Sequence, residues 1–313
     1  MRVKGFLGTA LWPFATSFAT QRLIGKDQGL VLTFHYIGSP VLQGVGEDLF
    51  MPLPEFRRVL DFISTRLNPL APAEFLRRMR EGTLPERATM ITFDDCLHGT
   101  CEQALPELSQ RGLAAAFFCC PGLIAANRTA PSVELMWMCA TAEIGDPASR
   151  VAAYERLWPE LLRRPSREHA AFLAQVREDF AIQAEVPRAL RAAQWALLAR
   201  MNAAGMLVGN HTMLHSTVTA DGVEQFEDDV ALAFHLIERQ MGERPRVFCY
   251  PYGRKADQAG TEDVLKKLGA EFAFVTQGGI ANPRRSGWLN LHREDASYSA
   301  NATKLAPLLA LLR

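Results

Sequence analysis

The sequence is poor in the features that mark several large classes of protein. Its 313 residues include only six cysteines and no CxxC pair, which argues against a zinc site built from cysteines. Adjacent Cys119 and Cys120 lie in an apolar run typical of a buried strand, so a disulfide framework is not expected. This cysteine usage indicates a reducing compartment. We therefore expect a cytoplasmic location, with a periplasmic or membrane-associated one as the alternative.

The chain also carries no formal net charge at pH 7. The 34 basic residues are balanced by 34 acidic ones, and nucleic acid is not expected as a partner because phosphate binding relies on a basic surface. The run 6–19 contains Pro13 and several Ser and Thr residues, so it is too short and too polar to span a membrane and lacks the core of a signal peptide. We expect residues 1–29 to form an N-terminal helical segment, with peripheral membrane association through residues 1–21 as an option. The oligomeric state stays open.

Short apolar runs rich in β-forming residues alternate with amphipathic stretches along the chain. The predicted strands are residues 30–37, 88–93, 114–120, 206–210, 246–250, 271–276 and 287–291. Apolar residues at helical spacing predict helices around 56–63, 223–241 and 264–268, the last followed by Gly269 as a C-cap. The alternation indicates one parallel α/β domain over residues 30–313, built as a barrel or as a doubly wound sheet.

One stretch, from about 125 to 186, breaks this rhythm. It is helical in character and has no clear strand. We expect a helical insertion carried on one βα loop, the kind of loop that shapes substrate pockets in barrels. Its residues Trp137 and Trp158 either pack the insertion or offer an aromatic face to a sugar.

The chemistry of the chain gathers at two places. His211 and His215 are four residues apart, so their imidazoles can aim at one point, and Asp95 ends the run TFDD after another predicted strand. Three ligands from His and Asp, with open positions left over, describe a catalytic metal site. Asp94 beside it could act as a base on metal-bound water. A divalent metal is therefore expected, zinc first, with cobalt, nickel or iron as alternatives.

Further polar residues follow other predicted strands. His35 lies near the end of the first, His292 follows the last, and Pro251-Tyr252-Gly253 follows another. In a parallel barrel the carboxyl ends of the strands meet on one face, where the active sites of such folds lie.

Four motifs, in this order, resemble the polysaccharide deacetylases, also called NodB-homology proteins or carbohydrate esterase family 4: ITFDD, AAAFFCCPGLI, VGNHTMLHS and FCYPYG. The resemblance implies a distorted (β/α)7 barrel, here with a helical insertion. It also implies metal-dependent removal of acetyl groups from N-acetylated sugars of a polysaccharide or oligosaccharide. The opening VLTFHYIG is similar to members that act on poly-N-acetylglucosamine-type exopolysaccharides.

The resemblance also implies roles for individual residues. Asp94 corresponds to the general base and Asp95 to the metal ligand that acts with the two histidines of VGNHTMLHS, while the backbone N–H of Tyr252 resembles the donor that helps to hold the oxyanion. The catalytic acid is His35 in the subset with the VLTFHYIG opening, but other members place it in a Leu-x-His motif that His292 matches. We favour His35.

This chain departs from the family pattern at two positions that matter. Cys96 replaces the Gly that usually follows the Asp pair, where it would be strained at positive φ and could approach the metal as a soft ligand. Cys249 replaces an Arg that steers the base, a role that Arg293 could take over. These changes leave a second hypothesis open, in which the chain is a glycan-binding protein that has lost turnover. An O-deacetylase or a small-amide hydrolase would use the same site.

Overall fold

A single parallel sheet forms the centre of the molecule in this computed structural model, which describes residues 26–38, 45–46, 49–253 and 260–296. Its strands run in the order β10-β9-β8-β7-β6-β5-β1-β11, and β4 pairs with β5. The bounds are β1 Leu30–Phe34, β4 Asn68–Pro69, β5 Ala88–Phe93, β6 Ala115–Cys119, β7 Leu207–Asn210, β8 Val247–Cys249, β9 Phe272–Val275, β10 Leu291–His292 and β11 Glu294–Asp295. β2 (Tyr36–Ile37) and β3 (Phe50–Met51) form a separate pair.

One short segment connects the two edges of this sheet. Leu291 of β10 is in register with Phe274 of β9, whereas Glu294 of β11 is in register with Leu32 of β1. Arg293 lies between the two pairings, so the segment 291–295 acts as the last strand of a barrel whose other strands are β1, β5, β6, β7, β8 and β9. The predicted distorted (β/α)7 barrel is confirmed.

The barrel interior is filled by alternate residues of the strands, because successive side chains of a strand point to opposite faces. One buried cluster collects the inward residues, among them Val31, Met90, Ala116, Phe118, Val247, Cys249, Phe274 and Leu291. Their sequence neighbours point outward and pack under the surrounding helices in two further clusters. Burial on both faces explains why these strands read as continuous apolar runs.

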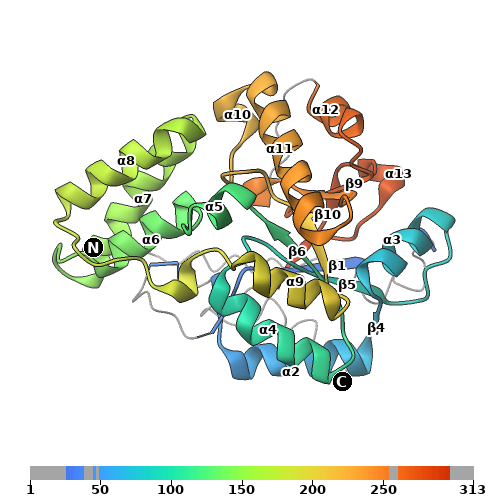
Figure 1. Ribbon diagram of the computed structural model, residues 1–313. Coiled ribbons are helices and arrows are strands. Elements are labelled where there is room, and N and C mark those ends of the chain that lie inside the picture. The colour runs from blue at the N-terminus through green and yellow to red at the C-terminus, as the bar shows by residue number, and fades with distance from the viewer. Residues whose placement is uncertain (1–25, 39–44, 47–48, 254–259, 297–313) are drawn as a thin grey trace, which may run out of the picture.

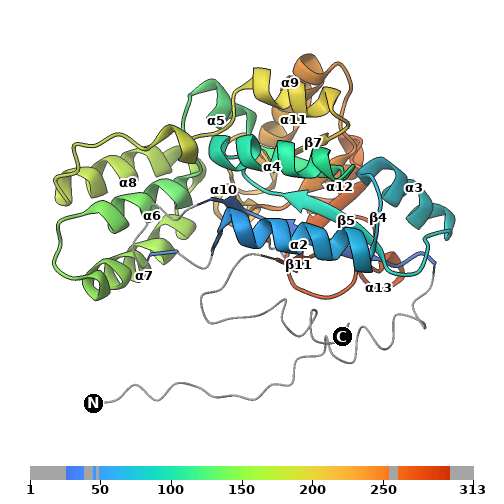
Figure 2. The same ribbon diagram turned by 90° about the horizontal axis from the view of Figure 1, so that it is seen from below.

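Helices surround the sheet, as Figures 1 and 2 show. Around the barrel lie α2 (Leu53–Arg66), α3 (Pro72–Glu81), α4 (His98–Gln110), α9 (Trp195–Ala203), α10 (Val218–Asp221), α11 (Val223–Met241), α12 (Thr261–Lys267) and α13 (Pro283–Ser286). The predicted apolar faces of α2 and α11 are buried. Gly269, with φ 85°, follows the end of α12. None of the helices in the described part of the chain is long and apolar enough to span a bilayer.

The predicted strand 287–291 was wrong. Asn282 caps the short helix α13 by accepting hydrogen bonds from the backbone of Arg284 and Arg285. Gly287 ends that helix with φ 81°, and the strand begins only at Leu291. Leu289 is buried and Trp288 half-buried by packing between elements, although neither belongs to a strand, and a short apolar run cannot reveal this difference.

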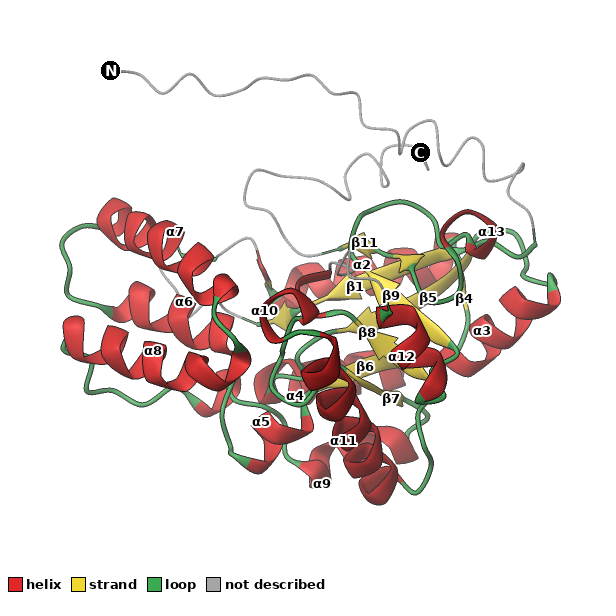
Figure 3. Cartoon of the chain, turned by 90° about the horizontal axis from the view of Figure 1, so that it is seen from above, coloured by secondary structure: helices red, strands yellow, loops and turns green. Residues whose placement is uncertain are grey.

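A helical lobe lies between β6 and β7. It comprises α5 (Pro121–Ala125), α6 (Pro131–Thr141), α7 (Pro147–Arg163), α8 (Ser166–Asp179) and the 3-10 turn η3 (Arg188–Leu190). Proline begins α5, α6 and α7, where its missing N–H costs nothing. In Figures 1 and 3, α6, α7 and α8 lie together at one side of the barrel. The stretch expected to form an N-terminal helical segment lies outside the described residues up to residue 25.

Candidate active site

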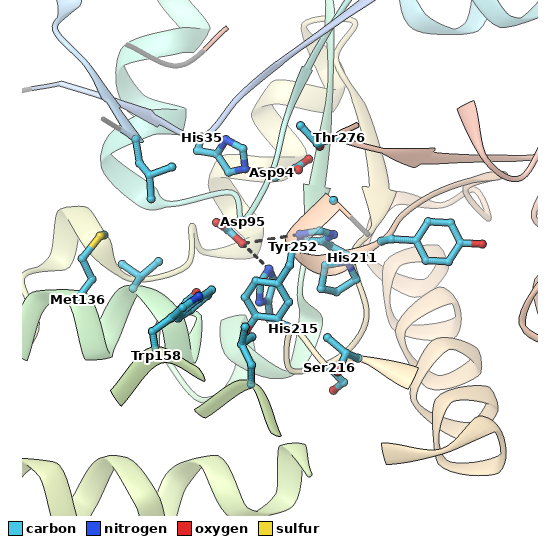
Figure 4. Close-up of a pocket in the computed structure, with 18 of the residues that line it drawn as sticks. His35, Asp94, Asp95, Met136, Trp158, His211, His215, Ser216, Tyr252 and Thr276 are labelled. Carbon is cyan, nitrogen blue, oxygen red and sulfur yellow. Dashed lines mark ion pairs between the residues drawn. The ribbon is translucent and has the colours of Figure 1, made fainter. Parts of the chain in front are cut away.

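The candidate active site is a cavity of about 720 Å³ at the carboxyl ends of the strands. Its lining includes His35, Asp94, Asp95, His211, His215 and Tyr252 from the barrel, together with side chains of α6 and α7. Figure 4 shows these side chains converging from separate elements. The expectation that the strand ends bring the polar residues to one face is therefore met in the structure, except for His292, which does not line the cavity.

Asp95, His211 and His215 form a compact group in which one ligand atom of each lies within 4.8 Å of the others. Asp95 Oδ1 is 3.3 Å from His215 Nε2 and 3.7 Å from His211 Nε2. His211 Nδ1 lies 2.8 Å from the carbonyl oxygen of Cys249. A carbonyl only accepts, so Nδ1 is the donor and Nε2 presents a lone pair towards Asp95.

The electrostatics of this group fit a divalent cation. Burial lowers the pKa of His211 to about 4 and that of His215 to about 3, so both rings are neutral near pH 7. Asp95 Oδ1 is buried and has no hydrogen-bond partner among the described residues. Lone pairs that face one another without a shared proton are unfavourable unless a cation lies between them. The donor set of two imidazoles and one carboxylate is typical of zinc and its neighbours.

Tyr36 is a part of this site that the motifs did not reveal. Its hydroxyl donates to Asp95 Oδ2 across 3.2 Å and leaves Oδ1 for the two histidines. Tyr36 is in VLTFHYIG, and its aromatic character alone predicts a core residue. Its polar role depends on β2 running beside the end of β5 and so could not be predicted from the sequence.

The two histidines lie on a tight loop, not on a helix. Asn210 Oδ1 accepts from the backbone N–H of Thr212, and Thr212 Oγ1 accepts from the N–H of Ser216. From α11, Asp229 accepts from the N–H of Met213 at 2.7 Å and from the hydroxyl of Ser216 at 2.9 Å. Thr212 therefore serves as a local structural hydroxyl. Asp229 lies outside every motif, and no pattern pointed to it.

Asp94 is held by Arg293 inside the barrel. The guanidinium donates from Nη1 to Oδ1 at 2.8 Å and from Nη2 to Oδ2 at 2.6 Å, and it also donates to Cys249 Sγ at 3.0 Å. Burial tends to raise the pKa of Asp94, but the charge and hydrogen bonds of Arg293 outweigh it and hold that pKa well below its usual value. Arg293 thus occupies the position expected of it when Cys249 takes the place of the usual Arg.

Cys96 keeps the backbone conformation of the glycine it replaces. Its φ is 47°, directly after Asp95 at 62°. Its buried thiol lies against the thiols of Cys101 and Cys119, and it belongs to neither of the metal-ligand groups found in the described residues. The expectation that Cys96 approaches the metal is wrong because the turn points its side chain into the core under α4.

The two candidates for the catalytic acid are separated by the structure. His35 lies between β1 and β2, lines the cavity, and has its Nε2 3.8 Å from Asp94 Oδ2. His292 is not among the lining residues, and its Nδ1 is 3.1 Å from the carbonyl oxygen of Gly278. Strand alternation explains this, because Arg293 points into the barrel and its neighbour His292 must therefore point out.

Tyr252 lies between Pro251 and Gly253 with φ 59° and ψ 14°. Its ring meets that of His215 edge to face, with centroids 4.4 Å apart. Eight described non-glycine residues have positive φ, and five of them belong to the site: Asp95, Cys96, Thr212, His215 and Tyr252. Such conformations are costly, and they persist where surrounding structure enforces them, often at active sites.

The helical lobe supplies the remaining wall of the cavity, including Met136, Tyr154 and Trp158. Trp137, the other aromatic candidate, is only 2% exposed and packs inside the lobe beneath Arg177. Each tryptophan therefore fits one of the two roles considered above: Trp137 packs the lobe, and Trp158 faces the cavity.

The motifs and their geometry agree with a comparison against protein families. The family described as polysaccharide deacetylase matches residues 81–273, more than half of the chain. The chain belongs to the polysaccharide deacetylase family. Membership supports deacetylase activity of the hydrolase class and an acetylated glycan as the substrate. The matched region includes Asp94, Asp95, both histidines of the VGNHTMLHS loop and Tyr252.

Solved structures show the same fold at low sequence identity. The Streptococcus pyogenes deacetylase PplD in complex with acetate is 16% identical, with a TM-score of 0.61 over 91% of this chain and 98% of that one. IcaB from Ammonifex degensii is 17% identical, with a TM-score of 0.58 over 91% and 96%. A de-N-acetylase from Aggregatibacter actinomycetemcomitans is 15% identical, with a TM-score of 0.57 over 91% and 100%. Among curated proteins, no match was found.

Proposed function

We propose that this protein removes acetyl groups from N-acetylated sugars of a polysaccharide or oligosaccharide with the help of a divalent metal held by Asp95, His211 and His215. One observation carries the proposal. The ligand atoms of these three residues lie within 4.8 Å of one another, with Asp95 Oδ1 buried and without a hydrogen-bond partner, beside a second carboxylate that Arg293 keeps ionised. Family membership supports the deacetylase chemistry.

Asp94 is the base in this reaction. When bound, a divalent cation would raise the acidity of a water molecule and polarise the acetyl carbonyl. Asp94 takes the proton of the attacking water, and Arg293 fixes the direction in which its oxygens point. A carboxylate whose pKa is held so low is a weak base and depends on that added acidity.

His35 is the proposed acid, and the backbone N–H of Tyr252 is the proposed donor to the developing oxyanion. The leaving amine must receive a proton, because expulsion of an amide anion is prohibitive in water. His35 lies at the cavity wall beside Asp94, with a side chain that is 21% exposed and therefore open to a substrate. The strained turn at Tyr252 is consistent with a backbone group aimed at a ligand.

Acetate release tests the proposal. The purified protein, supplied with Zn, Co or Ni, is incubated with N-acetylglucosamine oligomers and with O-acetylated glycans. We expect acetate from the N-acetylated substrates, and loss of that release in Asp94→Asn with the metal retained. No acetate from any acetylated sugar, with metal demonstrably bound, would sink the proposal. Release from O-acetylated glycans alone would identify an esterase that uses the same site.

A glycan-binding protein without turnover was the alternative suggested by Cys96 and Cys249. Arg293 weakens its motivation, because the guanidinium that Cys249 does not provide is present on Asp94. Cys96 weakens it further by keeping the left-handed turn of a glycine. Acetate release that depends on Asp94 would exclude this alternative.

A further inference from the structure

We infer that Tyr154 and Trp158, on helix α7 of the helical lobe, form a second sugar subsite that binds the C–H face of the pyranose next to the acetylated one. The inference rests on the proposed function and adds to it a preference for chains over single sugars. We call these two residues the aromatic wall. They are not part of any motif of the chain, and the lobe that carries them interrupts the barrel between β6 and β7.

The aromatic wall is continuous with the metal-ligand group. Tyr154 and Trp158 are stacked with ring centroids 5.8 Å apart. Trp158 meets Tyr252 edge to face at 5.2 Å, and Tyr252 in turn meets His215 at 4.4 Å. Figure 4 shows Trp158 beside Tyr252 and His215, on the side of Asp95 away from His35 and Asp94. A sugar whose acetyl group is at Asp95 would thus have a neighbour within reach of Trp158.

Helix α7 presents this wall as one stripe of its surface. Tyr154, Trp158 and Leu162 recur at intervals of four residues and line the cavity. Leu157 and Leu161, each three residues after a residue of the aromatic wall, form the adjacent stripe of the helix and are buried in the lobe. Packing of the lobe is therefore provided by one stripe, and the aromatic stripe remains half-buried at the cavity.

The chemistry of the wall suits a neutral sugar ring. The residues that the lobe contributes to the cavity include none with a charge: Ser132, Val133, Met136, Tyr154, Trp158 and Leu162. Tyrosine and tryptophan combine a broad apolar face with a polar tip, which matches a pyranose with an apolar C–H face and hydroxyls at its rim. A cavity of about 720 Å³ also has far more room than an acetyl group needs.

The experiment compares substrates of different length. Parent, Trp158→Ala, Trp158→Phe and Tyr154→Ala are assayed on N-acetylglucosamine oligomers from one to six units and on 4-nitrophenyl acetate, which is too small to reach the wall. In the parent, kcat/KM should rise with oligomer length. In Trp158→Ala, the loss on the oligomers should exceed the loss on the ester by roughly 10- to 100-fold, mainly through KM, as for truncation of a buried aromatic anchor. Trp158→Phe should recover part of it.

Trp137→Phe is the matched control, since Trp137 belongs to the same lobe but is buried away from the cavity. Equal losses on ester and oligomer in Trp158→Ala would overturn the inference and make Trp158 a mere support for Tyr252. So would a length dependence that survives in both alanine variants. Calorimetric titration with the hexamer separates the two proposals. If the parent releases no acetate yet binds the hexamer more tightly than Trp158→Ala does, only the proposed function fails; equal binding by both proteins overturns the subsite.

Discussion

Arg293 is fully buried in the barrel, and the carboxylate of Asp94 beside it balances its charge. A buried ion pair is weak evidence for stability, because the cost of removing both charges from water offsets their attraction. Phe118 beneath the guanidinium, at 5.7 Å, and the hydroxyls of Thr92 and Thr276 complete its surroundings. Replacement of such a pair by apolar residues is often neutral or stabilising, so we attribute the pair to the proposed mechanism. It keeps Asp94 ionised and fixes its orientation.

Removal of this guanidinium should have a large effect on stability. Arg293→Met leaves the Asp94 carboxylate buried without a partner, and we expect unfolding to become easier by about 3–5 kcal/mol in urea titrations. The pKa of Asp94 should then rise, because burial is opposed only by the weaker effects of His211 and His35, and the acid limb of the kcat/KM profile should move to higher pH. Arg293→Lys keeps the charge but loses the two-pronged contact.

Arg77 provides the control for this substitution. It is exposed, with ion pairs to Glu74 and Glu81, so Arg77→Met should leave the midpoint of urea unfolding close to that of the parent. Our account of Arg293 would be wrong if both methionine variants unfolded at the same urea concentration. An unchanged acid limb in Arg293→Lys together with a shifted one in Arg293→Met would support the electrostatic explanation.

His35 and His292 allow a second test at the residue scale. If His35 is the acid, His35→Ala should lower kcat by ~100- to 10,000-fold with metal content near that of the parent. His292→Ala, on the outward side of the strand, should change kcat little. An activated ester, whose leaving group hardly needs a proton, should rescue His35→Ala but not Asp94→Asn. The reverse pattern for the two histidines would transfer the role to His292.

Sequence reasoning succeeded for residues whose chemistry follows from a motif and failed for those whose role depends on packing. The ligand group followed from the spacing of the histidines and from the placement of Asp95 at a strand end. Arg293 could be proposed only because Cys249 left a role unfilled. Tyr36 and Asp229 contact the site through β2 and α11, and a residue whose role depends on where another element packs leaves no local pattern.

At the scale of elements, helix α11 does more than cover the sheet. Its Asp229 anchors the loop that carries both histidines, through Met213 and Ser216. Burial raises the pKa of this carboxyl to about 6, although the two hydrogen bonds oppose the shift. Folding therefore makes ionisation of the Asp229 carboxyl less favourable. The contact between α11 and the ligand loop consequently depends on pH.

The sign of this dependence follows from linkage. The unfolded Asp has a pKa of about 3.9, so between roughly pH 4 and 6 the folded state binds more protons than the unfolded state and the free energy of unfolding falls as pH rises. The two pKa values set an upper size of about 3 kcal/mol for this loss. Asp229→Asn keeps an oxygen acceptor for Met213 without a charge, so its stability should fall less over this range.

Urea denaturation between pH 4.5 and 7.5 measures the difference. Asp228→Asn, one residue earlier on α11 and exposed, is the control and should follow the parent. The metal-free protein is used throughout, so that the titration of the ligand histidines is common to all variants. The same pH slope in both asparagine variants would rule out Asp229 as the source of the effect.

Prediction of elements worked where a period was sustained and failed where it was not. The strand predicted at residues 88–93 has the bounds of β5, and α11 extends over the predicted residues 223–241. The two-residue strands β10 and β11 are too short to show an alternation of apolar and polar residues in the sequence, yet they close the barrel. Closure of the barrel could therefore be predicted only from the resemblance to a family and not from the pattern of apolar residues.

At the scale of the whole molecule, two units contribute different chemistry to one cavity. The barrel provides the carboxylates and the imidazoles that line the cavity, whereas the side chains from the lobe are apolar or aromatic except for Ser132. The sequence indicated that an insertion exists, but not which of its faces would meet the barrel. That depends on how α6, α7 and α8 pack against one another, as Figure 2 shows, and long-range packing of this kind has no signature in the spacing of residues.

A metal that joins Asp95 at the end of β5 to the loop after β7 should stabilise the whole barrel. Binding to the folded state alone adds about 2.7 kcal/mol when the metal is at ~100 times its Kd. In a protein of this size that corresponds to a rise in Tm of about 4 °C. We expect this rise when zinc is added to the metal-free protein, and its reversal by a chelator. His211→Ala and His215→Ala should lose most of the bound metal and the rise with it.

His292→Ala controls for the loss of a histidine near the barrel end, because His292 is no part of the ligand group and should keep both metal and the rise in Tm. Melting curves and metal content are measured on the same samples, so binding and stabilisation can be compared directly. Unchanged metal in both ligand variants would remove the basis of the mechanism. An unchanged Tm in the presence of bound zinc would show instead that the ion lies elsewhere. Zinc at a site that joins two strand ends must stabilise the folded state, because that site exists only in the folded protein.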